Sequence, residues 1–153
     1  MCQFLPTHGF EWVSSDKYST DFFLKQKDDQ PTGYMVEVDL DYPKELHDLH
    51  DTYPLAPEHL NIQKDMLSNY QKDLADNLGV KIGGDKLCLT LSDKKNYVCH
   101  YRNLRLYLEK GMRIQKVHRV LKFQQSAWLK DYIDLNTSLR QGAENKFEQS
   151  YSN

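Results

Sequence analysis

The nine residues GYMVEVDLD, numbered 33–41, alternate between apolar and polar side chains, except that Met35 lies on the polar side. The apolar set occupies every second position and comprises Tyr34, Val36, Val38 and Leu40. Because successive side chains of a β-strand point to opposite faces, this spacing predicts a strand with one buried face. Pro43 ends the strand, since proline has no N–H to donate to a β-ladder. One polar face is typical of an antiparallel sheet.

Other segments predict further strands and helices around this strand. Strands are expected over 10–13, 85–91 and 112–123, and helices over 61–78, 96–110 and from 127 onward. In the helix over 96–110 the apolar positions are Tyr97, Tyr101, Leu104 and Leu108. Simple alternation in 112–123 puts Ile114 and Lys116 on one face and Val117, Arg119 and Leu121 on the other. The segments together predict an α+β fold.

The composition favours a folded, polar, soluble protein. A mean hydropathy of -0.75 with 27% charged residues is typical of disorder, but 10 Tyr, 6 Phe and 2 Trp are too many rings for a disordered tail. There is neither a signal-peptide pattern nor an apolar run of about 18 residues, which predicts an intracellular protein of the nucleus or cytoplasm with no membrane partner. The three cysteines form no CxxC pair, which argues against a disulfide framework and a zinc ribbon.

Charge is distributed unevenly along the chain. Residues 1–93 carry 8 Lys+Arg against 17 Asp+Glu, whereas residues 94–153 carry 12 against 5. The C-terminal part therefore has the positive balance expected of a surface that faces a polyanion. A solvated face with lysine stems lying over a core explains the same pattern equally well from the residues alone.

Two groups of residues raise the question of a metal site. Glu37, Asp39 and Asp41 share one face of the predicted strand, and carboxylates hold Mg²⁺ in phosphoryl-transfer enzymes. A solvated strand face is the preferred interpretation, because one polar face is normal in such a sheet. His47 and His50 have H-x-x-H spacing, but no nearby cysteine completes a zinc site. We expect no metal ligands and no catalytic residues in the chain.

Three runs of residues carry a family resemblance. The first contains MCQ, LPT and GFEW, the second contains GY, EVDLDYP, LH and YPLAPE, and the third contains HYRNL, HRVLKFQ, WLK, YI and NT. In order and spacing these runs resemble family B DNA polymerases of the organellar, viral and transposon type, which start synthesis from a protein primer. The middle run resembles the transposon branch in particular.

The resemblance implies a fold and an activity for the parent protein. Residues 1–43 would form edge strands of an incomplete polymerase palm, 44–125 an insertion with mixed strands that contacts DNA or primer protein, and 126–153 the start of a fingers helix. The complete enzyme would be a DNA-directed DNA polymerase that extends a primer by nucleotidyl transfer with Mg²⁺, so its partners would be template-primer DNA, the primer terminal protein and deoxynucleotides. The catalytic aspartates would lie outside this chain, which we therefore expect to be inactive alone.

The resemblance also raises the expectation of nucleic-acid contact in the basic stretch. The DNA-binding candidates are Arg102, Arg105, Lys110, Arg113, Lys116, Arg119, Lys122 and Lys130. Arg140, on the expected fingers helix, is a candidate for binding the phosphates of an incoming nucleotide. The rings of Trp12, Tyr34, Trp128 and Tyr132 are assigned to core packing. The alternatives are a stand-alone nucleic-acid-binding or interaction module and a degraded relic of such an element.

Overall fold

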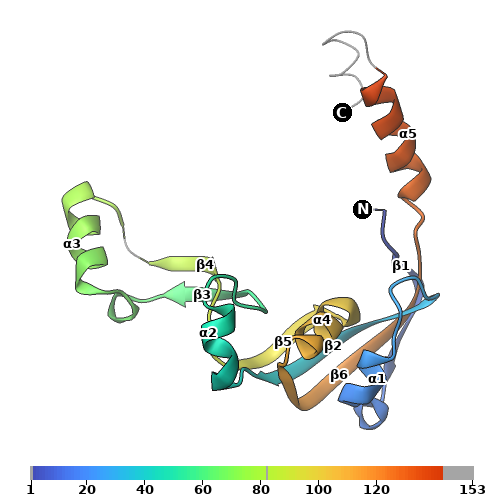
Figure 1. Cartoon of the computed structure of the whole chain (residues 1–153), viewed down its shortest axis with the longest axis horizontal. Coiled ribbons are helices and arrows are strands. Elements are labelled where there is room, and N and C mark those ends of the chain that lie inside the picture. The colour runs from blue at the N-terminus through green and yellow to red at the C-terminus, as the bar shows by residue number, and fades with distance from the viewer. Residues whose placement is uncertain (1, 82, 143–153) are drawn as a thin grey trace. The chain divides into compact units, whose positions relative to one another are not determined.

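The computed structural model describes residues 2–81 and 83–142, and its fold is mixed α+β with open antiparallel sheets (Figure 1). The chain divides into two compact units, one formed by Met1–Asp41 with Lys95–Asn153 and the other by Tyr42–Lys94. These units do not follow the three expected segments 1–43, 44–125 and 126–153. The reason is that strands from both ends of the chain belong to one sheet.

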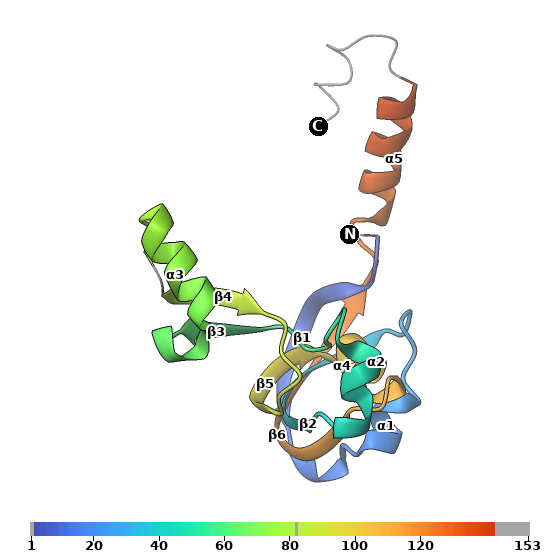
Figure 2. The same ribbon diagram turned by 60° about the vertical axis from the view of Figure 1, so that its left-hand side comes forward.

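The first unit is built on a four-stranded sheet. Its strands are β1 (Leu5–Val13), β2 (Thr32–Asp41), β5 (Lys94–His100) and β6 (Arg113–Ser126), in the order β1-β6-β2-β5. Strand β6 is antiparallel to both of its neighbours, β1 and β2. Figure 2 shows the four strands side by side from a second direction. The long central strand β6 therefore joins the N-terminal and C-terminal parts of the sheet.

The alternating segment forms β2, as its period predicts. Tyr34, Val36, Val38 and Leu40 are all buried, whereas the residues between them are partly exposed. Helices α1 (Thr20–Leu24) and α4 (Tyr101–Glu109) pack against each other, and α4 packs against β2. Phe23 of α1 and Leu104 of α4 are fully buried. One face of the sheet and these two helices thus supply most of the core.

The expectation of a helix over 96–110 is wrong for residues 96–100. Residues Lys94–His100 form the edge strand β5, and α4 begins only at Tyr101. The His100 side chain caps the helix, because its Nδ1 accepts the Arg102 backbone N–H at 3.3 Å. Pairing with β2 satisfies the backbone of the preceding residues, and aromatic and β-branched side chains such as Tyr97 and Val98 favour a strand.

The second unit contains a β-hairpin and a capped helix. Strands β3 (Glu58–Ile62) and β4 (Gly84–Cys88) pair antiparallel, and α3 (Asn69–Leu78) lies between them in sequence. Ser68 and Gln71 form a capping box at the start of α3, and Gly79 ends the helix with a left-handed φ of 62°. Helix α2 (His47–His50) is a single helical turn in the proline-rich connection. The helix expected over 61–78 begins only at Asn69, because the residues before it form β3 and a 3₁₀ turn. Short 3₁₀ turns occur at Ser15–Lys17, Lys44–Leu46 and Lys64–Met66.

The predicted C-terminal helix is present as α5 (Lys130–Gln141), although residues 143–153 lie outside the described part of the chain. Three of the four rings assigned to the core are exposed. Trp12, Trp128 and Tyr132 retain 64%, 59% and 64% of their accessible surface, whereas Tyr34 is buried as expected. The assignment was wrong for Tyr132 of α5 because amphipathic spacing shows that a helix has an apolar face but not what covers it.

Candidate nucleic-acid interface

Two β-bulges in β6 determine where its basic side chains point. The register with β2 pairs Glu37 with Arg119, Asp39 with Lys116 and Asp41 with Arg113, and it shifts between each of these pairs. Directly opposed residues share a face of the sheet. Each bulge adds one residue to β6, so a spacing of three residues on β6 matches a spacing of two on β2. The simple alternation expected for this strand, which separated Lys116 from Arg119, is therefore wrong.

The face that carries these residues is here termed the open face. It comprises Trp12, Met35, Glu37, Asp39, Asp41, Asn96, Val98, Arg113, Lys116, Arg119 and Leu121. Trp12 and Val98 retain most of their accessible surface, so this side of the sheet is open to a partner within the described part of the first unit. Three basic side chains of β6 lie in a row along it. The structure thus brings together Arg113, Lys116 and Arg119 from the predicted set.

Glu37 holds Arg119 in place on the open face. The Arg119 Nε donates to Glu37 Oε2 at 2.6 Å, and Asn96 Nδ2 donates to Glu37 Oε1 at 2.8 Å. These donors stabilise the carboxylate, so the Asn96 amide and then the Arg119 guanidinium lower the pKa of Glu37 below its ordinary value. The Arg119 Cζ also lies 5.5 Å from the centre of the Trp12 ring. Arg119 therefore links a carboxylate to an exposed indole.

Asp39 is surrounded by donors in the same way. Its Oδ1 accepts the Asn96 backbone N–H at 2.8 Å and lies 2.9 Å from His118 Nε2, while its Oδ2 lies 3.8 Å from Lys95 Nζ. The Asn96 hydrogen bond and then the His118 contact lower the pKa of Asp39. Asn96 serves both carboxylates because its φ of 50° turns the edge strand locally, a conformation that asparagine tolerates better than most residues.

The carboxylates of β2 thus act as hydrogen-bond acceptors within the sheet. Across the described residues no group of three or more His, Cys, Asp or Glu is arranged to hold a metal ion. In the second unit His47 Nε2 lies 3.2 Å from the Tyr42 carbonyl oxygen, and His50 Nδ1 lies 2.8 Å from the Tyr42 hydroxyl. The two histidines therefore contact one tyrosine.

An apolar groove lies beside the Glu37–Arg119 pair. It has a volume of about 270 Å³, and its walls are formed by Trp12, Met35, Val36, Glu37, Val98, Arg119 and Leu121. Trp12 and Met35 both oppose Leu121, which explains how strands distant in sequence form one wall. A groove with an indole wall and a guanidinium can stack a flat ring or accept an apolar side chain.

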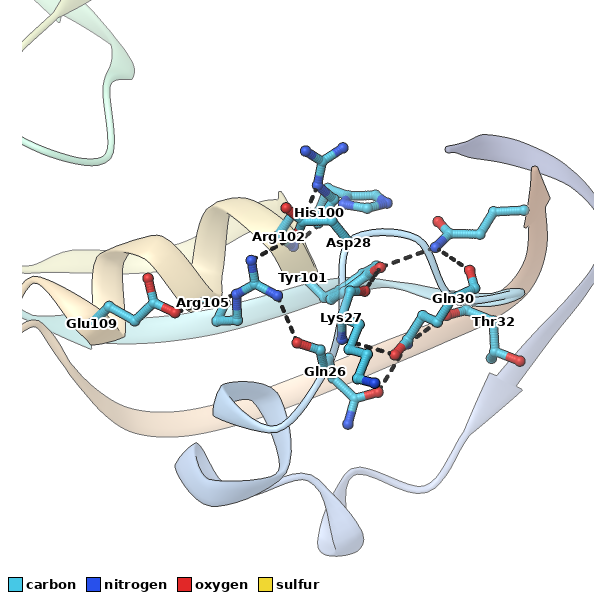
Figure 3. Close-up of polar contacts among 11 residues, drawn as sticks. Gln26, Lys27, Asp28, Gln30, Thr32, His100, Tyr101, Arg102, Arg105 and Glu109 are labelled. Atoms are coloured by element: carbon cyan, nitrogen blue, oxygen red, sulfur yellow. Dashed lines mark hydrogen bonds and ion pairs between the residues drawn. The ribbon is translucent and has the colours of Figure 1, made fainter. Parts of the chain in front are cut away.

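Arg102 and Arg105 lie away from the open face and bind the loop that precedes β2 (Figure 3). Arg105 donates from Nη1 to the Gln26 carbonyl at 2.6 Å and from Nη2 to Asp28 Oδ1 at 2.7 Å. Arg102 Nε lies 3.2 Å from the same Asp28 oxygen. Arg105 also lies 3.4 Å from Glu109, four residues along α4. The structure thus gives these two predicted DNA-binding residues intramolecular partners.

A buried hydrogen-bond network continues from this loop to β6 (Figure 3). The Tyr101 hydroxyl donates to the Lys27 carbonyl at 2.7 Å and accepts from Gln125 Nε2 at 2.9 Å. Gln125 Nε2 also donates to the Gln30 carbonyl at 2.8 Å. Burial raises the pKa of Tyr101, so its hydroxyl remains a donor at neutral pH. The network fixes α4, and with it Arg102, relative to the sheet.

The remaining candidates are dispersed. Lys122 opposes Tyr34 and is the strand neighbour of Leu121, which lies on the open face. Because neighbouring side chains of a strand point to opposite faces, Lys122 points away from the open face. Lys110 follows α4, and Lys130 pairs with Asp134 at 2.5 Å within α5. Arg140 is exposed in the last turn of α5. The described residues provide no ion pair for Lys110, Lys116 or Lys122, and so the eight predicted residues do not form one surface.

The positions of Trp12 and Asn96 on the open face were not predicted from the sequence. Both depend on pairing between strands far apart in the chain, since Trp12 opposes Leu121 and Asn96 bonds to Glu37 and Asp39. The only local signal was Asn96, which directly precedes the strand-forming residues Tyr97 and Val98.

Comparisons of the chain with family models, curated proteins and solved structures found no match. Among the described helices, none has both the length and the apolar character that crossing a membrane requires.

Proposed function

We propose that this chain is part of a protein-primed, family B DNA-directed DNA polymerase and that its open face contacts template-primer DNA. In this proposal the complete enzyme carries the catalytic aspartates and Mg²⁺ outside the chain. The present segment supplies edge strands of the palm, the insertion beside them and the start of the fingers, and it has no polymerase activity alone.

The order of the three motif runs supports the family, and Arg113, Lys116 and Arg119 support the contact with DNA. The two bulges of β6 place these three cations on one face, in a row beside the exposed ring of Trp12. Basic side chains along a strand can follow a phosphate backbone, and an exposed indole offers a surface on which a base can stack. Lys116 has no carboxylate partner among the described residues, so a phosphate binds it without first breaking an ion pair.

Salt dependence of DNA binding tests this contact. Each neutralised phosphate contributes about -0.9 to the slope of log K against log salt, so replacing Arg113 and Lys116 together by Gln is expected to reduce the slope by about 1.8. Lys17→Gln combined with Lys25→Gln removes the same charge from exposed positions outside the candidate set. Fluorescence anisotropy with a labelled primed duplex gives the slopes. Equal slopes for both double variants would refute the assignment of the open face.

Primer extension tests the role of the chain within the enzyme. The isolated 153-residue chain with Mg²⁺ and deoxynucleotides is expected to extend no primer. Extension by the chain alone would show that its catalytic groups have been placed wrongly.

A second candidate function is that of an interaction module that binds protein. The carboxylates Glu37 and Asp39 neutralise part of the positive charge of the open face, and the groove beside them is mostly apolar. Such a mixture of apolar and paired charged groups is typical of protein interfaces. Under this alternative, DNA binding is weak and independent of Arg113 and Lys116, while Trp12→Ala abolishes capture of the partner, the primer protein.

A further inference from the structure

A second cleft of the first unit lies on α4, away from the open face. It has a volume of about 380 Å³ and is lined by Gln3, Phe4, Leu5, Pro6, His100, Arg102 and Asn103. Its polar lining consists of one guanidinium, two carboxamides and one imidazole, and contains no carboxylate. The open-face groove, by contrast, includes Glu37 beside Arg119. The carboxylate nearest to Arg102, that of Asp28, is not part of the cleft lining.

Arg102 is oriented toward an external partner. Its Nε lies 3.2 Å from Asp28 Oδ1, and the described residues provide no partner for its two terminal nitrogens. Figure 3 shows these terminal nitrogens directed away from Asp28 and from the rest of the network. The side chain is only 23% exposed, so its position is restricted before any ligand arrives. A guanidinium held by Nε presents its remaining N–H groups as a preorganised donor pair.

We propose that this cleft binds a phosphate group of a nucleotide unit through the terminal nitrogens of Arg102 and the side-chain amide of Asn103. Paired guanidinium N–H groups match the oxygens of a phosphate, and the amide adds a neutral donor beside them. Phe4, Leu5 and Pro6 form an apolar wall in the same cleft, which suits a sugar or base attached to the phosphate. This inference rests on the proposed contact with DNA only for the source of the phosphate, which is a nucleic-acid backbone or a free nucleotide.

His100 contributes to the shape of the cleft as a neutral side chain. Burial lowers its pKa, and the Arg102 charge acts in the same direction, although Gln125 and Asp28 oppose this. Its Nδ1 accepts the Arg102 N–H, and therefore the proton of the neutral ring resides on Nε2. The ring thus supports the first turn of α4 while the guanidinium supplies the positive charge.

Two variants of the 153-residue chain test the site without relying on a single side chain. Arg102→Gln removes the donor pair. Asn103→Asp leaves Arg102 intact but places a carboxylate in the cleft, and an acidic residue in the first turn of a helix does not weaken the helix. Asn69→Asp is the matched control, because Asn69 is also an exposed asparagine in the first turn of a helix, α3.

The probes are inorganic phosphate, thymidine monophosphate and a single-stranded oligothymidylate, and amide chemical shifts in ¹⁵N NMR spectra report binding. Saturable shifts of the backbone amides of residues 102 and 103 are expected, with affinity about tenfold lower or worse in Arg102→Gln and Asn103→Asp and unchanged in Asn69→Asp. Tighter binding of thymidine monophosphate identifies a free nucleotide as the source, and tighter binding of the oligonucleotide identifies the backbone. Affinities in Asn103→Asp equal to those of the unmodified chain would overturn the proposal.

The NMR titrations and the salt slopes of DNA binding together separate this site from the proposed contact of the open face. If replacing Arg113 and Lys116 does not reduce the salt slope of DNA binding, but phosphate still binds at Arg102, only the open-face contact is refuted. If the double replacement reduces the salt slope as expected, but no saturable shift is seen at residue 103, only the phosphate site is refuted.

Discussion

Gly33 is expected to tolerate no larger side chain, and Gly33→Ala tests the packing at the start of β2. A Cβ at this position would lie 2.4 Å from Gln125 Oε1, 2.4 Å from Phe123 Cε2 and 2.8 Å from Gln125 Cδ. Real carbon contacts are never this short, so one of the two neighbours has to move. Gly33 is required here because of the space it leaves, not because of its backbone angles.

Neither neighbour can move without cost. Phe123 is fully buried, and the Gln125 amide donates to the Gln30 carbonyl and the Tyr101 hydroxyl. Overpacking of a core costs about 1–3 kcal/mol, and loss of one hydrogen bond of Gln125 adds about 1 kcal/mol. The expected decrease in the free energy of unfolding is therefore about 2–4 kcal/mol. For a unit of this size, each kcal/mol lowers Tm by about 4–8 °C.

Urea denaturation followed by tryptophan fluorescence measures this decrease. Gly142→Ala is the control, since its added Cβ would lie 3.5 Å from the Ser138 carbonyl oxygen, an ordinary contact, and it should stay within about 0.5 kcal/mol of the parent chain. Adding Gln125→Ala to Gly33→Ala should cost less than the sum of the two single changes, because the clash with the amide is then absent. A stability of Gly33→Ala within about 0.5 kcal/mol of the parent would refute the close packing.

Three further predictions concern buried titratable groups. The pKa of His100 is lowered in the folded chain, which therefore binds fewer protons than the unfolded chain. The free energy of unfolding should fall as the pH drops below 6.5 toward that lower pKa. His100→Gln should flatten the dependence of the urea midpoint on pH. Lys94 is fully buried 2.7 Å from Glu58, so Lys94→Met should destabilise the second unit by about 3 kcal/mol, and adding Glu58→Gln should recover part of this in thermal melts. Burial raises the pKa of Cys99 to about 12, so iodoacetamide at pH 8 should modify exposed Cys2 first, and equal rates by mass spectrometry would contradict the burial.

The elements with a strong local period were predictable from the sequence. Strand β2 follows from its alternation, and α3 follows from its apolar spacing and the glycine that ends it. Strand β5 was not predictable, because Tyr97 and Tyr101 fit a helical spacing by coincidence while pairing with β2 determines the conformation. Local propensity is a weak guide where an edge strand gains its hydrogen bonds from a distant segment.

The candidate interface was predictable in composition but not in arrangement. The basic stretch is visible in the sequence, yet Arg105 binds Asp28, which lies 77 residues earlier, and Arg119 binds Glu37, 82 residues earlier. Partners at such separations follow only from the fold. The sequence therefore indicated where cations are abundant, and the structure shows which of them are already paired.

The two bulges of β6 determine how the open face can bind an anion. Without them, alternation would send Lys116 and Arg119 to opposite faces, and no row of cations would exist. With them, each cation opposes a carboxylate of β2, and in the Arg119–Glu37 pair the Arg119 side chain is 65% exposed whereas that of Glu37 is only 14% exposed. A phosphate therefore has to compete with Glu37 for Arg119, but it meets no such competition at Lys116, which has no ion-pair partner among the described residues. Lys116 is accordingly the residue whose replacement should weaken DNA binding most on this face, and Arg119 should contribute only after its carboxylate partner has been removed.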